Sequence, residues 1–433
     1  MDRRVGCGKG EINLLVYFIV ILFGIGSWVA VNGLWVELPI MVPFLPEGWK
    51  LPSYLTIIIQ LANIGPLIVT MLYMCYRNKL NDKLIIYVIL AIGAMSCMLL
   101  AFFWKKTSTV FGDDHSVGLF ILDFFLSLVD CTSSVVFLPF MALFHVKYMT
   151  ALYIGEGLSG LLPSLVALGQ GVGKMTCQNV TNVNQTANIS YYHIKPIYQD
   201  PSFPVEYFCF FLFGMMLICA LAFTLLNYLP YCKKEHILRT TDPGNEMYEL
   251  KNKEKSSIKK QTMKIRPATI ALYLSLIAVI NSLTNGLLSG IQSYSCLPYG
   301  NDAYHLTVTL SKIANPVVCF FAFLLPVSSA AVITVCVTLG TAISAYIILM
   351  ASQSPTPWLY DEPAGPPLMI SSWVIMGSLM TFSKVSIASV LREEGKTALL
   401  WCGVVTQLGS LIGAILSYVL VNVLRLFESA PVC

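Results

Sequence analysis

The residues of this chain best suited to chemistry are polar side chains placed inside long apolar runs. Seven of them are amides: Asn32, Gln60, Asn63, Asn281, Asn285, Asn315 and Gln407. An amide buried in hydrocarbon must be hydrogen-bonded, either to a neighbouring helix or to a ligand. Helix-to-helix contact is the simpler interpretation of any single one. Many amides among few charges favour a neutral polar solute, because the donor and acceptor of an amide match a lactam or imide edge.

Two tryptophans flank the first of these amides. Trp28 precedes Asn32 by four residues and Trp35 follows it by three, so all three side chains share one face of a helix. A flat aromatic solute would stack on these rings. The alternative for Trp35 is a place in the aromatic belt at the membrane interface.

Six ionisable residues also lie in the apolar runs: Glu37, Asp123, Asp130, Glu156, Lys312 and Lys384. A charge at the membrane centre costs about 3 kcal/mol or more, so each needs a cavity or a partner. Asp130 and Lys384 lie 13 and 16 residues into their runs. This similar depth predicts an ion pair or a shared polar network, with Glu156 as its third member. The alternatives are separate partners for each and, for Lys312, a stem that snorkels to the interface.

The composition excludes most other classes of protein. Of the 433 residues, 56% are hydrophobic and 12% charged, whereas about 25% are charged in soluble domains. The net charge of +4 and the absence of a basic patch argue against a nucleic-acid partner. The chain has neither a CxxC pair nor a nucleophile–base constellation or phosphate loop. We therefore expect no enzyme activity, no metal and no cofactor.

The apolar runs predict an all-α integral membrane protein. A membrane-spanning helix needs roughly 20 apolar residues. Arg3, Arg4 and Lys9 precede the first run in the manner of a signal peptide, but that run is far longer than a signal core. We therefore expect an uncleaved first span. The eleven predicted spans are 14–41, 53–75, 84–104, 117–140, 151–171, 205–229, 268–291, 304–325, 330–350, 368–391 and 398–424.

Two loops predict the orientation. The loop 172–204 carries three glycosylation sequons, at Asn179, Asn184 and Asn188, which places it outside the cell. The loop 231–267 contains ten Lys and Arg against five acids, which places it in the cytoplasm. A single span separates them, so the two assignments agree. They predict a cytoplasmic N-terminus and an extracellular C-terminus.

Short motifs recur along the chain at a nearly constant offset. Asn32-Gly33-Leu34 returns as Asn285-Gly286-Leu287, Asn63 as Asn315, and Glu156 as Gln407, at offsets of 251 to 253 residues. Copies six spans apart enter the membrane in the same direction, which predicts a parallel repeat as in the major facilitator architecture. The predicted organisation is a six-helix bundle (1–230), a basic cytoplasmic linker (231–267) and a five-helix bundle (268–433). A disordered linker is the simpler interpretation of 231–267, and lipid or partner binding is the alternative.

Cysteines on the predicted outer side offer a covalent link. Cys177 and Cys296 follow the fifth and seventh spans on the oxidising side of the membrane, so a disulfide between them is predicted. The segment Pro46–Trp49 lies on the same side. There Glu47 is expected to be a solvated loop carboxylate, and a role in a gate or a proton response is the alternative.

Longer motifs resemble a known family, the animal riboflavin transporters of solute carrier family 52. The resemblance covers essentially all spans. Its clearest motifs are GSWVAVNGLWVELPI (26–40), QLANIGPLIVT (60–70), GEGLSGLLPSLVALGQG (155–171) and TNGLLSGIQSYSCLPYG (284–300). It implies a plasma-membrane carrier of riboflavin, without a sodium requirement and with pH dependence in some members. It also implies an eleven-helix fold similar to the equilibrative nucleoside transporters. Family members can join the loop before span 10 to the C-terminal tail by a disulfide, but 351–367 holds no cysteine, so Cys433 lacks that partner.

Riboflavin fits the interpretation reached from the residues, because it is neutral and flat with an imide edge and a hydroxylated tail. We expect a monomer in the lipid bilayer that holds it between the two bundles and works by alternating access. A nucleoside carrier and a non-transporting receptor are the competing hypotheses. The predicted substrate-binding residues are Trp28, Asn32, Trp35, Gln60, Asn63, Ser133, Asn285, Gln292 and Asn315.

Overall fold

The computed structural model consists almost entirely of long helices. It describes residues 13–75, 81–110, 112–141, 143–144, 147–171, 175–184, 189–198, 201–236, 266–324, 327–394 and 396–429.

Within the described residues, eleven segments are long and apolar enough to cross a membrane, with one bent pair of helices counted as a single span. Ten are single helical segments, and the eleventh is a pair of shorter helices bent by 53°. The eleven predicted spans are therefore confirmed. In chain order the helices are α1 (Leu14–Ile25), α2 (Val29–Met41), η1 (Val42–Phe44), η2 (Gly48–Lys50), α3 (Leu51–Ala62), α4 (Ile64–Cys75), α5 (Asp82–Phe103), α6 (Val117–Met141), α7 (Lys147–Gln170), α8 (Val205–Tyr228), α9 (Pro230–Lys234), α11 (Pro267–Asn281), η3 (Ser282–Leu287), α12 (Leu288–Cys296), η4 (Leu297–Tyr299), α13 (Asn301–Leu324), α14 (Ala330–Ser352), α15 (Gly365–Glu394), α16 (Lys396–Tyr418) and η5 (Val419–Val423).

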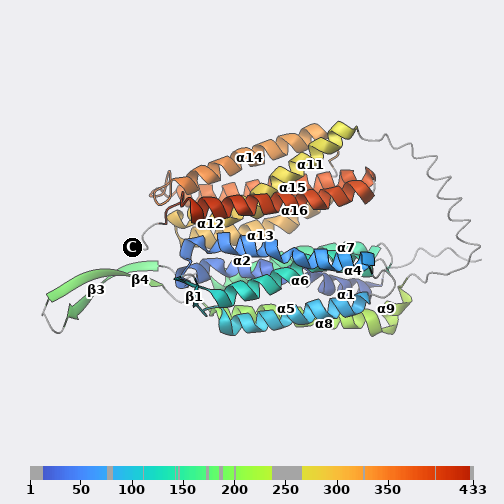
Figure 1. The fold of residues 1–433 in the computed structure, drawn as a ribbon, viewed down its shortest axis with the longest axis horizontal. Coiled ribbons are helices and arrows are strands. Elements are labelled where there is room, and N and C mark those ends of the chain that lie inside the picture. Colours follow the sequence, from blue (N-terminus) through green and yellow to red (C-terminus); the bar gives the residue numbers. More distant parts are fainter. Residues whose placement is uncertain are drawn as a thin grey trace, which may run out of the picture.

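The helices gather into two groups that lie side by side. Figure 1 shows α1 to α9 in one group, in blue and green, and α11 to α16 in the other, in yellow to red. In the first group α1 packs on α7, and α5 packs on α6 and α8. In the second group α11 and η3 pack on α16, and α15 packs on α13 and α14. The groups touch where α7 meets α13 and where α3 meets α12 and α16.

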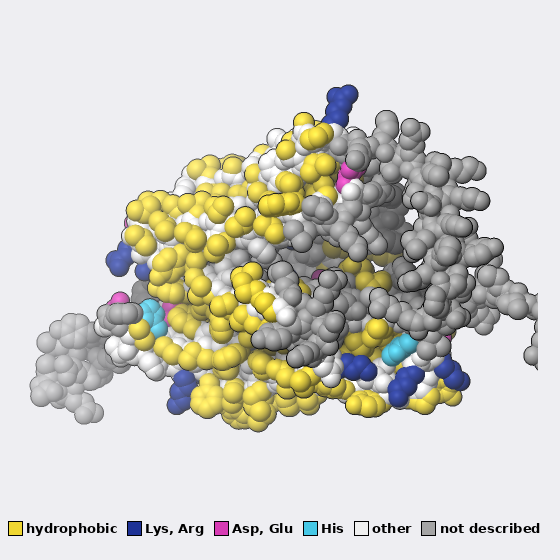
Figure 2. Space-filling model, turned by 45° about the vertical axis from the view of Figure 1, so that its right-hand side comes forward, with side chains coloured by type: hydrophobic (Ala, Val, Ile, Leu, Met, Phe, Trp, Pro, Cys, Tyr) yellow, Lys and Arg dark blue, Asp and Glu magenta, His cyan; other side chains and the backbone are white. Residues whose placement is uncertain are grey.

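The outer surface of the helices is apolar. Large hydrophobic side chains point outward from several spans, among them Leu221 at 59%, Phe320 at 61% and Ile412 at 62% exposed. Figure 2 shows hydrophobic side chains over most of the visible face, with lysine and arginine near its edges. Hydrocarbon around the protein accounts for this pattern, since water would leave so much apolar surface unfavourably exposed.

Two small antiparallel sheets lie at one end of the helices. Ser108 pairs with His115 in the first sheet, and Met175 pairs with Tyr198 in the second. The four strands are β1 (Ser108–Val110), β2 (Asp113–His115), β3 (Met175–Asn184) and β4 (Ile189–Tyr198). The second sheet falls in the predicted glycosylated loop. The side chains of Asn179, Asn184 and Asn188 lie outside the described residues, so their glycosylation stays a prediction.

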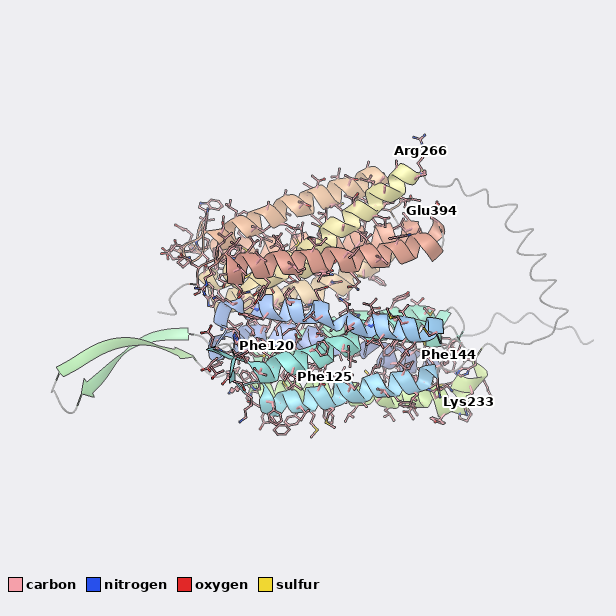
Figure 3. The ribbon with its side chains drawn as sticks, in the orientation of Figure 1. Phe120, Phe125, Phe144, Lys233, Arg266 and Glu394 are labelled. Carbon is pink, nitrogen blue, oxygen red and sulfur yellow. The ribbon has the colours of Figure 1, made fainter. Side chains whose placement is uncertain are left out.

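The predicted basic linker begins and ends at the opposite end of the molecule. Lys233, Arg266 and Glu394 all lie at that end in Figure 3, whereas Phe120 lies toward the sheets. Residues 237–265 lie outside the described residues. The two ends are thus distinguished by the sheets and the linker, and which end faces the cytoplasm stays a prediction.

The predicted disulfide between Cys177 and Cys296 is wrong. Cys296 is a free thiol and is fully buried at the end of α12. It lies 3.5 Å from Ser295 Oγ, which in turn accepts a hydrogen bond of 3.2 Å from the indole of Trp373. The thiol therefore packs inside the second group of helices. The side chain of Cys177 lies outside the described residues.

Glu47 is buried, which overturns the expectation of a solvated loop carboxylate. Its side chain is 1% exposed. The carboxylate accepts hydrogen bonds from the backbone N–H of Ser116 at 2.8 Å and from the Ser116 hydroxyl at 2.6 Å. The Nδ1 atom of His115 lies 3.2 Å away. Glu47 thus ties the loop before α3 to the start of α6.

We expect Glu47→Ala to destabilise the protein, because it leaves the buried donors of Ser116 without an acceptor. Each such donor costs about 1–3 kcal/mol. The apparent melting temperature of the purified protein in detergent measures the effect. Glu362→Ala, which truncates an exposed carboxylate in the loop before α15, is the control. Equal melting temperatures for the two variants would contradict this role of Glu47.

Candidate functional site

The first span breaks inside the membrane, between α1 and α2. The break comprises residues 26–28 and is held by side chains of its own segment and of α6. Ser27 Oγ donates to the carbonyl of Gly24 at 2.7 Å. Asp130 Oδ2 accepts from the backbone N–H of Val31 at 3.0 Å, and Ser133 Oγ donates to the carbonyl of Ser27 at 3.0 Å. Backbone groups freed in hydrocarbon need such partners.

These contacts reassign two predicted residues. Asp130 binds the first turn of α2, so the predicted ion pair between Asp130 and Lys384 is wrong; the ion pairs among the described residues are Lys105–Glu206 and His115–Glu47. Ser133 is fully buried, and its hydroxyl binds two backbone carbonyls, those of Ser27 and Asp130. Both residues shape the broken span, and we remove Ser133 from the candidate site.

The break places Asn32 one turn into α2, where it meets α7. Asn32 Nδ2 donates to Ser159 Oγ at 3.4 Å. In the second group Asn285 Nδ2 donates to Ser410 Oγ at 3.2 Å. The two asparagines are 253 residues apart and the two serines 251, so the hydrogen bond recurs at the offset of the sequence motifs.

Close backbone packing recurs at an offset of 254 residues. A Cβ atom on Gly155 would lie 2.8 Å from the Cα of Gly24, and one on Gly409 would lie 3.1 Å from the Cα of Ala278. Each glycine therefore lets one helix approach another without a side chain between them. In the second group Asn285 lies in η3, a π-helical stretch (Ser282–Leu287) that begins directly after the place corresponding to the break in the first span. π-Helical turns are frequent at functional sites.

One hydrogen bond joins the two groups near the middle of the spans. Lys312 Nζ, on α13, donates to Asn32 Oδ1 at 2.9 Å. The amide of Asn32 thus binds α7 through its nitrogen and α13 through its oxygen. Depth in a run did not predict this contact, because a lysine stem can lie along several faces of its helix.

Glu156 and Lys384 lie on helices of different groups, α7 and α15. Among the described residues neither forms an ion pair with the other or with Asp130, so the predicted network of three charges is not formed. Asp130 belongs to the helix break instead.

Most of the remaining predicted residues lie apart from the bond between Lys312 and Asn32. Asn63 Nδ2 donates to Gln60 Oε1 at 3.2 Å at the end of α3. Trp28 lies at the helix break, whereas Trp35 and Gln292 are buried in α2 and α12. Among the polar residues singled out from the sequence, the exposed ones are Glu156, Asn285, Asn315 and Gln407. Exposed polar groups on a span belong to a water-accessible surface rather than to lipid.

The two groups also touch at the end that carries β1 and β2. Ser293 Oγ donates to the carbonyl of Trp49. Asn422 Nδ2 donates to Ser53 Oγ at 2.8 Å. The rings of Tyr54 and Tyr418 meet edge to face, with 5.5 Å between their centroids. The sequence does not predict these pairs, because each residue alone looks like an ordinary polar or aromatic side chain at a helix end.

Comparison with known proteins gives consistent matches. The model of the family described as "Solute carrier family 52, riboflavin transporter" matches residues 12–429. Member 3-B of that family from Danio rerio is 45% identical over 97% of this chain and 99% of its own length. Human member 3 is 40% identical over 97% of this chain and 98% of its own length.

Solved structures share the fold at low sequence identity. A mutant of the nucleoside transporter NupG matches with a TM-score of 0.52 and 13% identity, over 94% of this chain and 90% of its own. The xylose transporter XylE from E. coli, titled as a partially occluded inward-open conformation, matches with a TM-score of 0.52 and 12% identity, over 94% of this chain and 97% of its own. These matches confirm the predicted major-facilitator-like fold.

Proposed function

The chain belongs to the solute carrier family 52 riboflavin transporters, and from that premise we propose that it carries riboflavin across the plasma membrane by alternating access. It is a multi-pass membrane transporter and not an enzyme. The proposal adds how the substrate is held and how the two groups of helices move.

The observation that carries the proposal is the hydrogen bond between Lys312 and Asn32 that joins the two groups, with Asn285 at the position related to Asn32 by the repeat. Asn285 and Asn315 are exposed on their spans. Riboflavin is neutral and flat, with an imide edge and a hydroxylated tail. Amides match the imide edge, and the tail donates and accepts further hydrogen bonds.

We propose that the two groups are bundles of six and five spans related by a parallel repeat. The recurring asparagine–serine bond and the recurring glycine contacts support this division. So does the equivalence of the inter-group contacts, since α7 meets α13 as α16 meets α3. Two similar bundles moving about a shared site are the mechanical basis of alternating access.

The remaining parts of the proposal concern orientation and coupling. We place the N-terminus and the linker 231–267 in the cytoplasm, and the end with the sheets outside. Uptake without sodium, pH dependence and a monomeric state complete it. In this orientation the contacts of Trp49, Ser53 and Tyr54 with the second bundle close the extracellular side.

Uptake of labelled riboflavin into liposomes that contain the purified protein tests the function. Replacement of sodium by choline, a series of external pH values, and competition by excess uridine test the coupling and the substrate class. Riboflavin uptake that excess uridine abolishes would identify a nucleoside carrier instead. Absence of any riboflavin uptake would refute the proposal.

Asn285→Ala should weaken riboflavin uptake while the protein still reaches the cell surface. The side chain is exposed, and an alanine loses hydrogen bonds of about 0.5–1.5 kcal/mol each, so the KM should rise about tenfold. Asn32→Ala should act in the same direction. Asn227→Ala is the matched control, since that amide donates only to Phe223 of its own helix. Normal KM values in both site variants would refute the site.

A reversible cross-link should hold the extracellular side closed until it is reduced. The double variant Ser53→Cys with Asn422→Cys replaces side chains that lie 2.8 Å apart in different bundles. Oxidation should form a disulfide and stop uptake, and a reductant should restore it. The two single variants control for oxidation of the native cysteines. Full uptake by the cross-linked protein would show that this contact does not open during transport.

A further inference from the structure

We propose that Lys312 exchanges partners during transport: its ammonium binds Asn32 in the empty carrier and the acceptor edge of the substrate in the loaded one. The inference rests on the proposed function and extends it, because it names the residue that couples substrate binding to the contact between the bundles. The acceptor edge is the face of the ring system that carries carbonyl oxygens and ring nitrogens.

The hydrogen bond between Lys312 and Asn32 lies where the two bundles meet. Lys312 Nζ lies 2.9 Å from Asn32 Oδ1, and the two residues are 280 positions apart, on α13 and α2. The bond therefore joins the bundles, and it uses an amide that the sequence analysis assigns to the substrate. A substrate that takes the place of the ammonium at Asn32 Oδ1 frees Lys312 to bind it.

The ammonium of Lys312 has few partners within the protein. An ammonium carries three donors, and the acceptor recorded for Lys312 among the described residues is Asn32. No carboxylate in that part of the chain lies within ion-pair distance of it. The side chain of Lys312 is half-buried, and a cation with one protein acceptor favours any ligand that brings further acceptors.

The helices around this bond pack closely on one another. A Cβ atom on Gly157 would lie 3.1 Å from Pro316 Cβ, and one on Gly160 would lie 3.5 Å from Asn32 Nδ2. The glycine face of α7 thus packs closely on α13 and α2. Because the helices are in close contact here, an exchange of partners falls to the flexible stem of Lys312.

The bond between Lys312 and Asn32 has no equivalent at the repeat-related position. At the repeat offset of 252 to 253, the counterparts of Lys312 and Asn32 are Gln60 and Asn285. In the described residues these two bond within their own bundles, Gln60 with Asn63 and Asn285 with Asn281 and Ser410. The shared fold therefore does not require a bond at this position. The cation bridge is a feature of one side only, as expected for a specialised role.

The chemistry of the substrate completes the inference. A flat dioxo heterocycle offers carbonyl oxygens and ring nitrogens to the ammonium. The freed amide of Asn32 then offers its donor and acceptor to the imide group. Both bonds replace the hydrogen bond between Lys312 and Asn32, so substrate binding removes this connection between α13 and α2.

Binding of riboflavin to the purified full-length protein, followed by quenching of riboflavin fluorescence, tests the proposal. Lys312→Met keeps the length of the side chain without its charge and should weaken binding at least tenfold. Lys312→Arg should retain most of the affinity. Lys105→Met, which removes an exposed lysine paired with Glu206, is the control and should bind as the wild type does.

A second variant separates exchange from a purely structural role. Asn32→Asp should turn the bond into an ion pair, which raises the melting temperature of the empty carrier and weakens riboflavin binding at least tenfold. Lumiflavin, which lacks the hydroxylated tail, should lose affinity for Lys312→Met by the same factor as riboflavin.

Each outcome decides between the hypotheses. Wild-type affinity in Lys312→Met would overturn the exchange and leave the transport function intact. Unchanged lumiflavin binding in that variant would overturn the assignment of the ammonium to the ring edge. Failure of the wild-type protein to bind or transport riboflavin would overturn the proposed function and, with it, the exchange.

Discussion

A backbone group without a partner in hydrocarbon is too costly to tolerate, and this constraint organises the centre of the molecule. The first span breaks at residues 26–28, and α6 supplies the missing partners through Asp130 and Ser133. A carboxylate that looks like part of a transport pathway is thereby a cap for a half-helix. The bend that it stabilises gives Asn32 its position between α7 and α13.

The second bundle meets the same requirement with a different backbone. The first span breaks and bends by 53°, whereas the seventh continues and winds into a π-helix directly after the corresponding point. In both spans an asparagine lies at the same point of the repeat, where it donates to a serine on another helix of its own group, Ser159 on α7 or Ser410 on α16. The side-chain contact is thus more closely shared than the backbone that presents it. This is why the motifs recur in the sequence although the helices differ in shape.

The sequence predicted features that depend on the length of the apolar runs and on the repeat. It did not predict features that depend on the direction in which a side chain points. Run lengths predicted the spans, since hydrocarbon thickness sets them. Depth alone paired Asp130 with Lys384, but the acceptor role of Asp130 depends on a bend that hydropathy does not register. Membrane side alone paired Cys177 with Cys296, but that thiol is fully buried in the second group. Glu47 looked solvated because its loop is polar, whereas its burial depends on Ser116, which lies 69 residues away.

Repeat-related positions on the two sides of the bundle interface make different hydrogen bonds. On one side a charge spans the bundles, from Lys312 to Asn32, and on the other an amide, Gln60, stays within its own bundle. Consequently Asn285 keeps an exposed side chain while Asn32 is engaged by both bundles. The proposed exchange uses this difference: Asn285 is open to receive riboflavin, and Asn32 is released only when riboflavin replaces the cation that holds it.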